Sequence, residues 1–320
     1  MDQPRIIFMG TPVFAFSMLQ TLLTMPYTIV GVVTQPDRYV GRKRVLTSPP
    51  VKTLAKEAGL AVLQPEKIRE KQALEAIANL KPNMIVTAAY GQILPVSLLN
   101  MMTLGAYNVH ASILPKYRGG APIQHAILQG ETETGVTIMT MVKAMDAGAM
   151  WSQIMVPIDP VMTYGELHDE LANQGSQLLR ETLPKIIAGT VQPIEQDPEK
   201  VSFAPTLTRD DEQLDFSQSY QKVFNRIRAL SPSPGAFTYL GDKLLKIWYA
   251  TANVSFEGSG DPGQIVAVTS DGPLIACGTG AIIATKVQLE GKSMQSGAEF
   301  VRGNRNLVGS MLKNVRERAK

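Results

Sequence analysis

Cysteine is almost missing from this chain, because Cys277 is the only one in 320 residues. A single thiol cannot form an intramolecular disulfide, and it cannot supply the thiolates of a structural zinc site. Histidine is also scarce, and His110, His125 and His168 show none of the spacings that put two ligands on one helix face. We therefore expect no metal centre.

Long apolar runs are missing as well. No stretch approaches the roughly 18 apolar residues that a membrane-spanning helix needs. Residues 1–5 lead into a short strand rather than into a signal peptide. With 44% hydrophobic and 18% charged residues, the composition is that of an ordinary globular protein. These features predict a cytoplasmic chain with no membrane partner.

The opening of the chain lacks the glycines of a dinucleotide-binding site. An apolar strand at 5–9 runs into Gly10, and a helix is expected from 13 to 23. Pro12 and Ala15 stand where the fingerprint has its second and third glycines. No nicotinamide or flavin cofactor is indicated.

The net positive charge of the chain comes entirely from residues 206–320. Residues 1–205 hold 17 Lys and Arg against 17 Asp and Glu, whereas residues 206–320 hold 14 against 11. A second basic group, in the segment 35–50, consists of Arg38, Arg42, Lys43 and Arg44. Such clusters are typical of contact with a polyanion, but they also occur on solvated tails and loops.

The chain does contain a regular alternation of apolar strands and helices. We expect strands at 5–9, 28–34, 83–88, 105–110, 135–142 and 149–158, and helices at 13–23, 66–81, 119–129 and 163–189. This order predicts an α/β fold with a doubly wound, mainly parallel, Rossmann-like sheet. Residues 35–50 are expected to form an unusually long loop.

The character of the sequence changes after residue 189. Residues 190–208 are rich in proline and are expected to be a linker. Ser217 could cap the helix that follows. Five short strands are expected at 236–240, 243–250, 263–268, 274–277 and 281–289, which suggests a small OB-like β-barrel. The predicted domains are therefore 1–189 and 209–320, joined by the linker 190–208.

Polar side chains gather around the strand that ends at residue 110. Asn108 and His110 share one face of this strand, because side chains alternate with period two. Asp146 follows the strand at 135–142, so an amide donor, an imidazole and a carboxylate could converge at the sheet edge. Each also has an ordinary structural interpretation: Asn108 and Asp146 in turns, His110 in the core.

Several motifs together resemble the folate-dependent formyltransferases. These are the Asn-Val-His-Ala-Ser-Ile-Leu-Pro run at 108–115, Tyr-Arg-Gly at 117–119, Gly-Val-Thr at 135–137, Met-Asp-Ala-Gly at 145–148 and the opening at 8–12. The resemblance covers almost the whole chain. Ile113 and Tyr117 replace the family's usual leucine and tryptophan, and both replacements keep an apolar or aromatic side chain at that position. The basic loop and the C-terminal barrel resemble the members that act on methionyl-tRNA.

The resemblance implies formyl transfer from 10-formyltetrahydrofolate to the α-amine of initiator methionyl-tRNA. It implies that Asn108 and His110 stabilise the tetrahedral intermediate and that Asp146 supports His110 and proton transfer. It also implies a folate-binding loop and tRNA contacts in the basic segment. The folate loop consists of Ser112, Ile113, Leu114 and Pro115, with 92–94 lining the same pocket, and the tRNA contacts are Arg42, Lys43 and Arg44.

Other functions remain open from the sequence. A formyltransferase with a small acceptor, or a formyl hydrolase, would use the same three residues. A non-catalytic nucleic-acid-binding protein would need only the barrel and the basic tail 302–320, which holds six Lys and Arg against one Glu. The sequence does not decide which group accepts the amine proton, and a monomer is expected by default.

Overall fold

The computed structural model describes residues 3–41, 44–253, 256, 258 and 260–314. The chain divides into two compact units. The first consists of residues 1–122, 133–157 and 168–205, and the second of 123–132, 158–167 and 206–320. Residues 190–205 thus belong to the first unit, and two short stretches before residue 189 belong to the second. The boundaries of the predicted domains stay a prediction.

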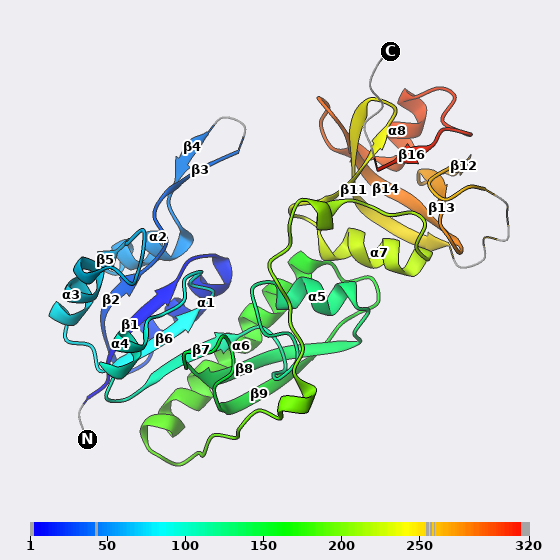
Figure 1. Ribbon diagram of the computed structural model, residues 1–320. Coiled ribbons are helices and arrows are strands. Elements are labelled where there is room, and N and C mark those ends of the chain that lie inside the picture. Colours follow the sequence, from blue (N-terminus) through cyan, green and yellow to red (C-terminus); the bar gives the residue numbers. More distant parts are fainter. Residues whose placement is uncertain (1–2, 42–43, 254–255, 257, 259, 315–320) are drawn as a thin grey trace. The chain divides into compact units, whose positions relative to one another are not determined.

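The first unit is built on a seven-stranded sheet of order β5-β2-β1-β6-β7-β8-β9 (Figure 1). The pairs from β5 to β7 are parallel, and β8 and β9 are antiparallel. The mainly parallel Rossmann-like sheet is therefore confirmed. The strands are β1 (Arg5–Gly10), β2 (Thr28–Val33), β5 (Val62–Leu63), β6 (Met84–Ala88), β7 (Ala106–His110), β8 (Glu133–Thr140) and β9 (Met150–Pro157).

Helices cover both faces of this sheet. Ile7 and Met9 of β1 share a buried cluster with α3 and α4, whereas α1 packs on β1 and β6 from the other face. The parallel strands are apolar on both sides because both sides are covered. The helices of the chain before residue 190 are α1 (Val13–Leu23), α2 (Pro50–Glu57), α3 (Lys71–Asn79), α4 (Val96–Asn100), α5 (Pro122–Leu128) and α6 (Tyr164–Ile187).

The segment 35–50 is not a simple loop. It contains a two-stranded hairpin, β3 (Arg38–Val40) and β4 (Val45–Thr47), and α2 begins at Pro50 (Figure 1). Every residue of the two strands is exposed. An alternation between buried and exposed side chains is the usual signal of a strand, and none exists here. The prediction of one long loop over 35–50 was wrong for this reason.

The second unit carries an antiparallel sheet of order β12-β13-β14-β11-β10-β16, with β15 paired to β14. Backbone hydrogen bonds from Ile265 to Ser310 and from Leu312 to Gly263 join the two ends of this path. The sheet therefore curls into a small barrel, as predicted. Its strands are β10 (Ala236–Leu240), β11 (Lys243–Asn253), β12 (Ile265–Val268), β13 (Pro273–Ala276), β14 (Ala281–Leu289), β15 (Gln295–Ser296) and β16 (Leu312–Lys313).

Two helices contribute buried side chains to the core of this sheet. α7 (Tyr220–Ala229) contributes Val223 and Ile227, and α8 (Gly297–Gly303) contributes Phe300. Ser219, and not Ser217, caps α7, because its Oγ accepts the hydrogen bond of the Lys222 amide. Ser217 instead donates to Asp215. Short 3₁₀ turns at Pro198–Lys200 and Asp210–Glu212 complete the elements.

In the described part of the chain, we find no helix with both the length and the apolar composition that a membrane crossing requires.

Candidate active site

The predicted imidazole and carboxylate lie beside each other at the end of β7. His110 is the last residue of the strand and its side chain is 6% exposed. The loop between β8 and β9 carries Asp146, whose Oδ2 lies 3.8 Å from His110 Nδ1. Gly119 donates its backbone N–H to the same oxygen over 2.9 Å. The carboxylate is therefore held by a backbone donor on one side and faces the ring on the other.

The other ring nitrogen fixes the tautomer of His110. Its Nε2 lies 3.0 Å from the carbonyl oxygen of Tyr117. A carbonyl only accepts hydrogen bonds, so Nε2 carries a proton. In the neutral ring the lone pair is then on Nδ1, which faces Asp146. A proton gained at Nδ1 would lie between the ring and the carboxylate.

Asn108 is oriented by a residue that the sequence analysis did not identify. The hydroxyl of Thr87, at the end of β6, donates to Asn108 Oδ1 over 2.7 Å. With its oxygen occupied, Asn108 presents its amide N–H₂ as the free donor end. Met141 Sδ is 3.3 Å from the same hydroxyl, so the start of the β8–β9 loop lies beside the Thr87–Asn108 pair.

The residues predicted to bind folate lie in a closely packed loop. Ser112 and Leu114 are buried, and the Ser112 hydroxyl donates to the carbonyl of Lys116. The hydroxyl of Thr137 accepts from the Leu114 amide and donates to the Ser112 carbonyl. Only Ile113 and Pro115 keep partly exposed side chains. The loop is therefore held in place by burial and hydrogen bonds, and its folate-binding role stays a prediction.

Of the residues 92–94, only Ile93 is free to line a pocket. Gln92 accepts from the amide of Ile68 and thereby holds the chain before α3, and Leu94 lies in the core. Ile93 is 75% exposed, and Val142 and Met145 on the β8–β9 loop are also exposed. These apolar side chains belong to the loops that flank Asn108.

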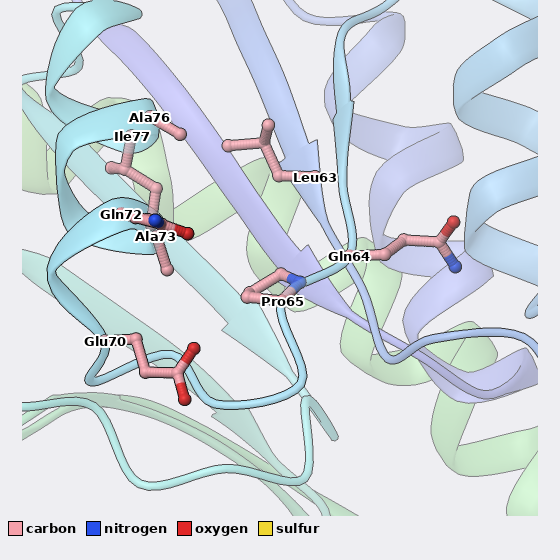
Figure 2. A pocket seen from close by; sticks show the side chains of 8 residues that line it. All are labelled: Leu63, Gln64, Pro65, Glu70, Gln72, Ala73, Ala76 and Ile77. Carbon is pink, nitrogen blue, oxygen red and sulfur yellow. The ribbon is translucent and has the colours of Figure 1, made fainter.

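The base of the β3–β4 hairpin is anchored by Asp37. Its carboxylate accepts hydrogen bonds from Gln64, Lys52 and Ser48. The bond from Gln64, followed by that from Lys52, lowers the pKa of Asp37 to about 2. Figure 2 shows Gln64 extending away from α3, on the edge of a hollow between β5 and α3. None of the predicted site residues lines this hollow.

We expect Asp37→Asn to destabilise the protein at neutral pH but not in acid. A carboxyl whose pKa is lowered by folding stabilises the folded state above its unfolded pKa of about 4, and this contribution is lost as the pH falls towards 2. The thermal midpoints of the wild type and the variant should therefore differ at pH 6, and the difference should shrink below pH 4 and vanish only as the pH approaches 2. A difference that is independent of pH would contradict the assignment.

The predicted tRNA contacts are only partly described. Arg42 and Lys43 lie outside the described residues. The guanidinium of Arg44 lies 5.4 Å from the centre of the Tyr39 ring, and Tyr39 is 64% exposed. Arg38 forms an ion pair with Glu66. The hairpin thus presents a cation and an exposed aromatic ring side by side.

Comparison with known proteins identifies both units. Residues 4–183 match the formyl transferase family, and residues 206–305 match the formyl transferase C-terminal domain. The methionyl-tRNA formyltransferase of Bacillus subtilis is 48% identical over 309 residues, covering 96% of this chain and 97% of that protein. That of Listeria monocytogenes serotype 4a is 50% identical over 311 residues, covering 95% and 97%.

Solved structures share the fold at low sequence identity. A sugar 3N-formyl transferase, determined in the presence of dTDP and 5-N-formyl-THF, aligns with a TM-score of 0.68 and 18% identity, covering 92% of this chain and 100% of that one. An N-formyltransferase from Helicobacter canadensis aligns with a TM-score of 0.64 and 20% identity, covering 88% and 99%. With matches over both units and close relatives over nearly their full length, the chain belongs to the formyl transferase family.

Proposed function

We propose that this enzyme transfers the formyl group of 10-formyltetrahydrofolate to the α-amino group of methionyl initiator tRNA. The observation that carries the proposal is the cluster of Asn108, His110 and Asp146 at the carboxyl end of β7. The relatives that are 46–50% identical over nearly the whole chain bear the name of this activity.

In this proposal Asn108 stabilises the charge that develops on the formyl oxygen. The amine attacks the formyl carbon, and the carbon–oxygen double bond gives its electron pair to the oxygen. A donor aimed at such an oxyanion contributes about 3–4 kcal/mol to the transition state. Thr87 occupies the amide oxygen of Asn108, so the N–H₂ group is the end available for this task.

His110 and Asp146 then act together on the proton of the attacking amine. As the new carbon–nitrogen bond forms, the amine must lose a proton, and the nitrogen of the departing tetrahydrofolate must gain one. His110 Nε2 is committed to the Tyr117 carbonyl, so the ring accepts and returns a proton at Nδ1. The Asp146 carboxylate stabilises the ring while it is charged.

The formyl donor is proposed to bind between the loops around Asn108. Ser112, Ile113, Leu114 and Pro115 contribute one wall, and the exposed side chains of Ile93, Val142 and Met145 offer apolar surface to a flat ring system. A fused heterocycle with polar edges fits a site of this composition.

The methionyl-tRNA is proposed to contact the β3–β4 hairpin and the second unit. Arg44 beside the exposed Tyr39 offers a charge for phosphate and a ring for base stacking, and Arg42 and Lys43 add two positive charges to this part of the sequence. Small antiparallel barrels are often used on nucleic acids, and the net positive charge of residues 206–320 suits this partner. We propose residues 1–189 as the catalytic domain, 190–208 as the connection and 209–320 as the tRNA-binding domain of a cytoplasmic monomer.

One assay tests the proposed function directly. The enzyme is incubated with 10-formyltetrahydrofolate and methionine-charged initiator tRNA, and the product is examined for a blocked methionine amine. Methionine-charged elongator tRNA and a nucleotide-linked amino sugar serve as alternative acceptors. Formylation of the sugar but not of the tRNA would replace the proposal by the small-acceptor alternative. Release of formate without either product would favour a hydrolase.

We expect Arg42→Ala to raise KM for methionyl-tRNA, to lower kcat and to leave folate binding unchanged. Displacement of a reacting group by about 1 Å can lower the rate about a hundredfold, so the effect on kcat can exceed that on KM. Steady-state kinetics and a folate titration measure both effects. Lys185→Ala, which removes an exposed charge at the end of α6, is the matched control. An equal loss of folate affinity would contradict a role at the tRNA.

A further inference from the structure

The stretch from Ile194 to Ala204, which lies entirely within the predicted linker 190–208, runs along both loops of the site. Ile194 exchanges two backbone hydrogen bonds with Met150 at the start of β9. Further along, Ser202 accepts from the Arg118 amide, and Ala204 donates to the Arg118 carbonyl. We call residues 194–204 the strap. It joins the loop after β7 to the loop between β8 and β9.

One side chain of the strap links these two loops through all of its polar atoms. Gln196 Oε1 accepts from Nε and Nη2 of Arg118, over 3.0 and 2.7 Å. Gln196 Nε2 donates to the backbone carbonyls of Asp146 and Gly148, each over 2.8 Å. An amide group has two acceptor sites and two donor hydrogens, so the hydrogen-bonding capacity of Gln196 is fully used.

The linked residues are neighbours of the catalytic pair. Arg118 stands between Tyr117, whose carbonyl holds His110 Nε2, and Gly119, whose amide holds the Asp146 carboxylate. Asp146 itself has a φ of +50°, in the left-handed region that side chains with a Cβ rarely adopt. The hydrogen bond from Gln196 to the Asp146 carbonyl supports this backbone conformation directly.

Gly119 and Gly148 lie too close to neighbouring backbone to carry a side chain. A Cβ on Gly119 would lie 2.5 Å from the carbonyl of Ala204 in the strap, and one on Gly148 would lie 1.9 Å from that of Thr140. The backbones of both loops therefore approach their neighbours as closely as only glycine permits. A side chain at either glycine would therefore displace its loop, and Gln196 connects the two loops.

We propose that Gln196 is a positioning residue for formyl transfer: its amide fixes the Asp146 loop against the Arg118 loop, so that the Asp146 carboxylate faces Nδ1 of His110. The assignment rests on the proposed function, because it concerns the same site. Gln196 touches no reacting atom and acts only through Asp146 and His110.

The test uses Gln196→Leu in the full chain, which removes all four hydrogen bonds at nearly constant volume. We expect kcat to fall about ten- to a hundredfold, as for other small displacements of a reacting group, with both KM values little changed. Gln192→Leu, at an exposed glutamine just before the strap, is the matched control and should behave as the wild type. Gln196→Glu still accepts from Arg118 but cannot donate to the two carbonyls, so it should be impaired like the leucine variant.

A double-mutant cycle distinguishes an effect of Gln196 on the position of Asp146 from a general disturbance of the structure. If Gln196 acts through Asp146, adding Gln196→Leu to Asp146→Asn should lower kcat hardly further. Multiplied losses, or a leucine variant with wild-type kcat, would overturn the proposal. The imidazole ¹⁵N signal of His110, one of three histidines, gives a readout without turnover. It should shift in Gln196→Leu and not in Gln192→Leu, and an unshifted signal would also overturn it.

Measurements on the wild-type enzyme distinguish a failure of this proposal from a failure of the proposed function. Absence of methionyl-tRNA formylation by the wild type would contradict the proposed acceptor. The His110 signal would still report whether Gln196 holds the Asp146 loop, whatever the acceptor.

Discussion

Asp146→Asn and His110→Ala should each lower kcat for formyl transfer about a hundred- to ten-thousandfold, the usual contribution of a positioned acid–base group. Asparagine at 146 still accepts from the Gly119 amide and tolerates a positive φ, so the loop should keep its conformation. Only the charge beside the ring is lost. Alanine at 110 removes the ring and leaves the Tyr117 carbonyl without that donor.

The double variant tests whether the pair acts as one unit. If the carboxylate serves only to orient and stabilise the imidazole, its loss has little effect once the ring is gone. Single-turnover rates of the double variant should then match those of the worse single variant. Fully multiplicative losses in kcat would contradict joint action of His110 and Asp146. Near-normal turnover in either single variant would contradict the catalytic assignment. Unchanged thermal midpoints are the folding control.

Asn108→Ala should lower kcat about a hundred- to a thousandfold, as expected when one oxyanion donor is removed. KM for both substrates should change little, because the charge on the formyl oxygen develops only in the transition state. The half-buried side chain contributes little to the core, so the folded structure should persist. An equal rise in KM with unchanged kcat would instead mean that Asn108 binds the ground state.

Thr87→Val should show a smaller loss of the same kind. Valine has the shape of threonine but cannot donate to Asn108 Oδ1, so the amide is free to rotate. We expect kcat to fall about tenfold, in line with the loss of one buried hydrogen bond of about 1–1.5 kcal/mol. Thr87→Ser retains the hydroxyl and should restore most of the rate. In an Asn108→Ala background the valine substitution should have no further effect on kcat.

Apolar periodicity predicted most of the elements. α1, β10 and β14 have the bounds expected from the sequence, because their apolar runs end at clear turn residues. The same principle could not find β3 and β4, whose residues are all exposed. Ser217 and Ser219 are equally suitable caps by residue type, and only the backbone geometry assigns the cap of α7 to Ser219.

The candidate site was predictable where chemistry and local spacing coincide. Asn108 and His110 lie two residues apart on one strand, so the period of the strand puts both on one face. Thr87 could have been noticed in the sequence, because it is the one residue with a hydroxyl in the buried strand 84–88. Nothing in the sequence pointed to Gln196, because its partners Arg118 and Asp146 lie 78 and 50 residues away along the chain.

The sequence by itself determined the fold class and the family, and it pointed to Asn108, His110 and Asp146 as candidates for the site. These follow from local periodicity and from motifs of neighbouring residues. Only the tertiary structure decided that the stretch after residue 190 lies along the site and that Gln196 joins its two loops. Contacts between distant loops depend on where the sheet and helices bring them, and no pattern of neighbouring residues encodes which polar side chain meets which carbonyl.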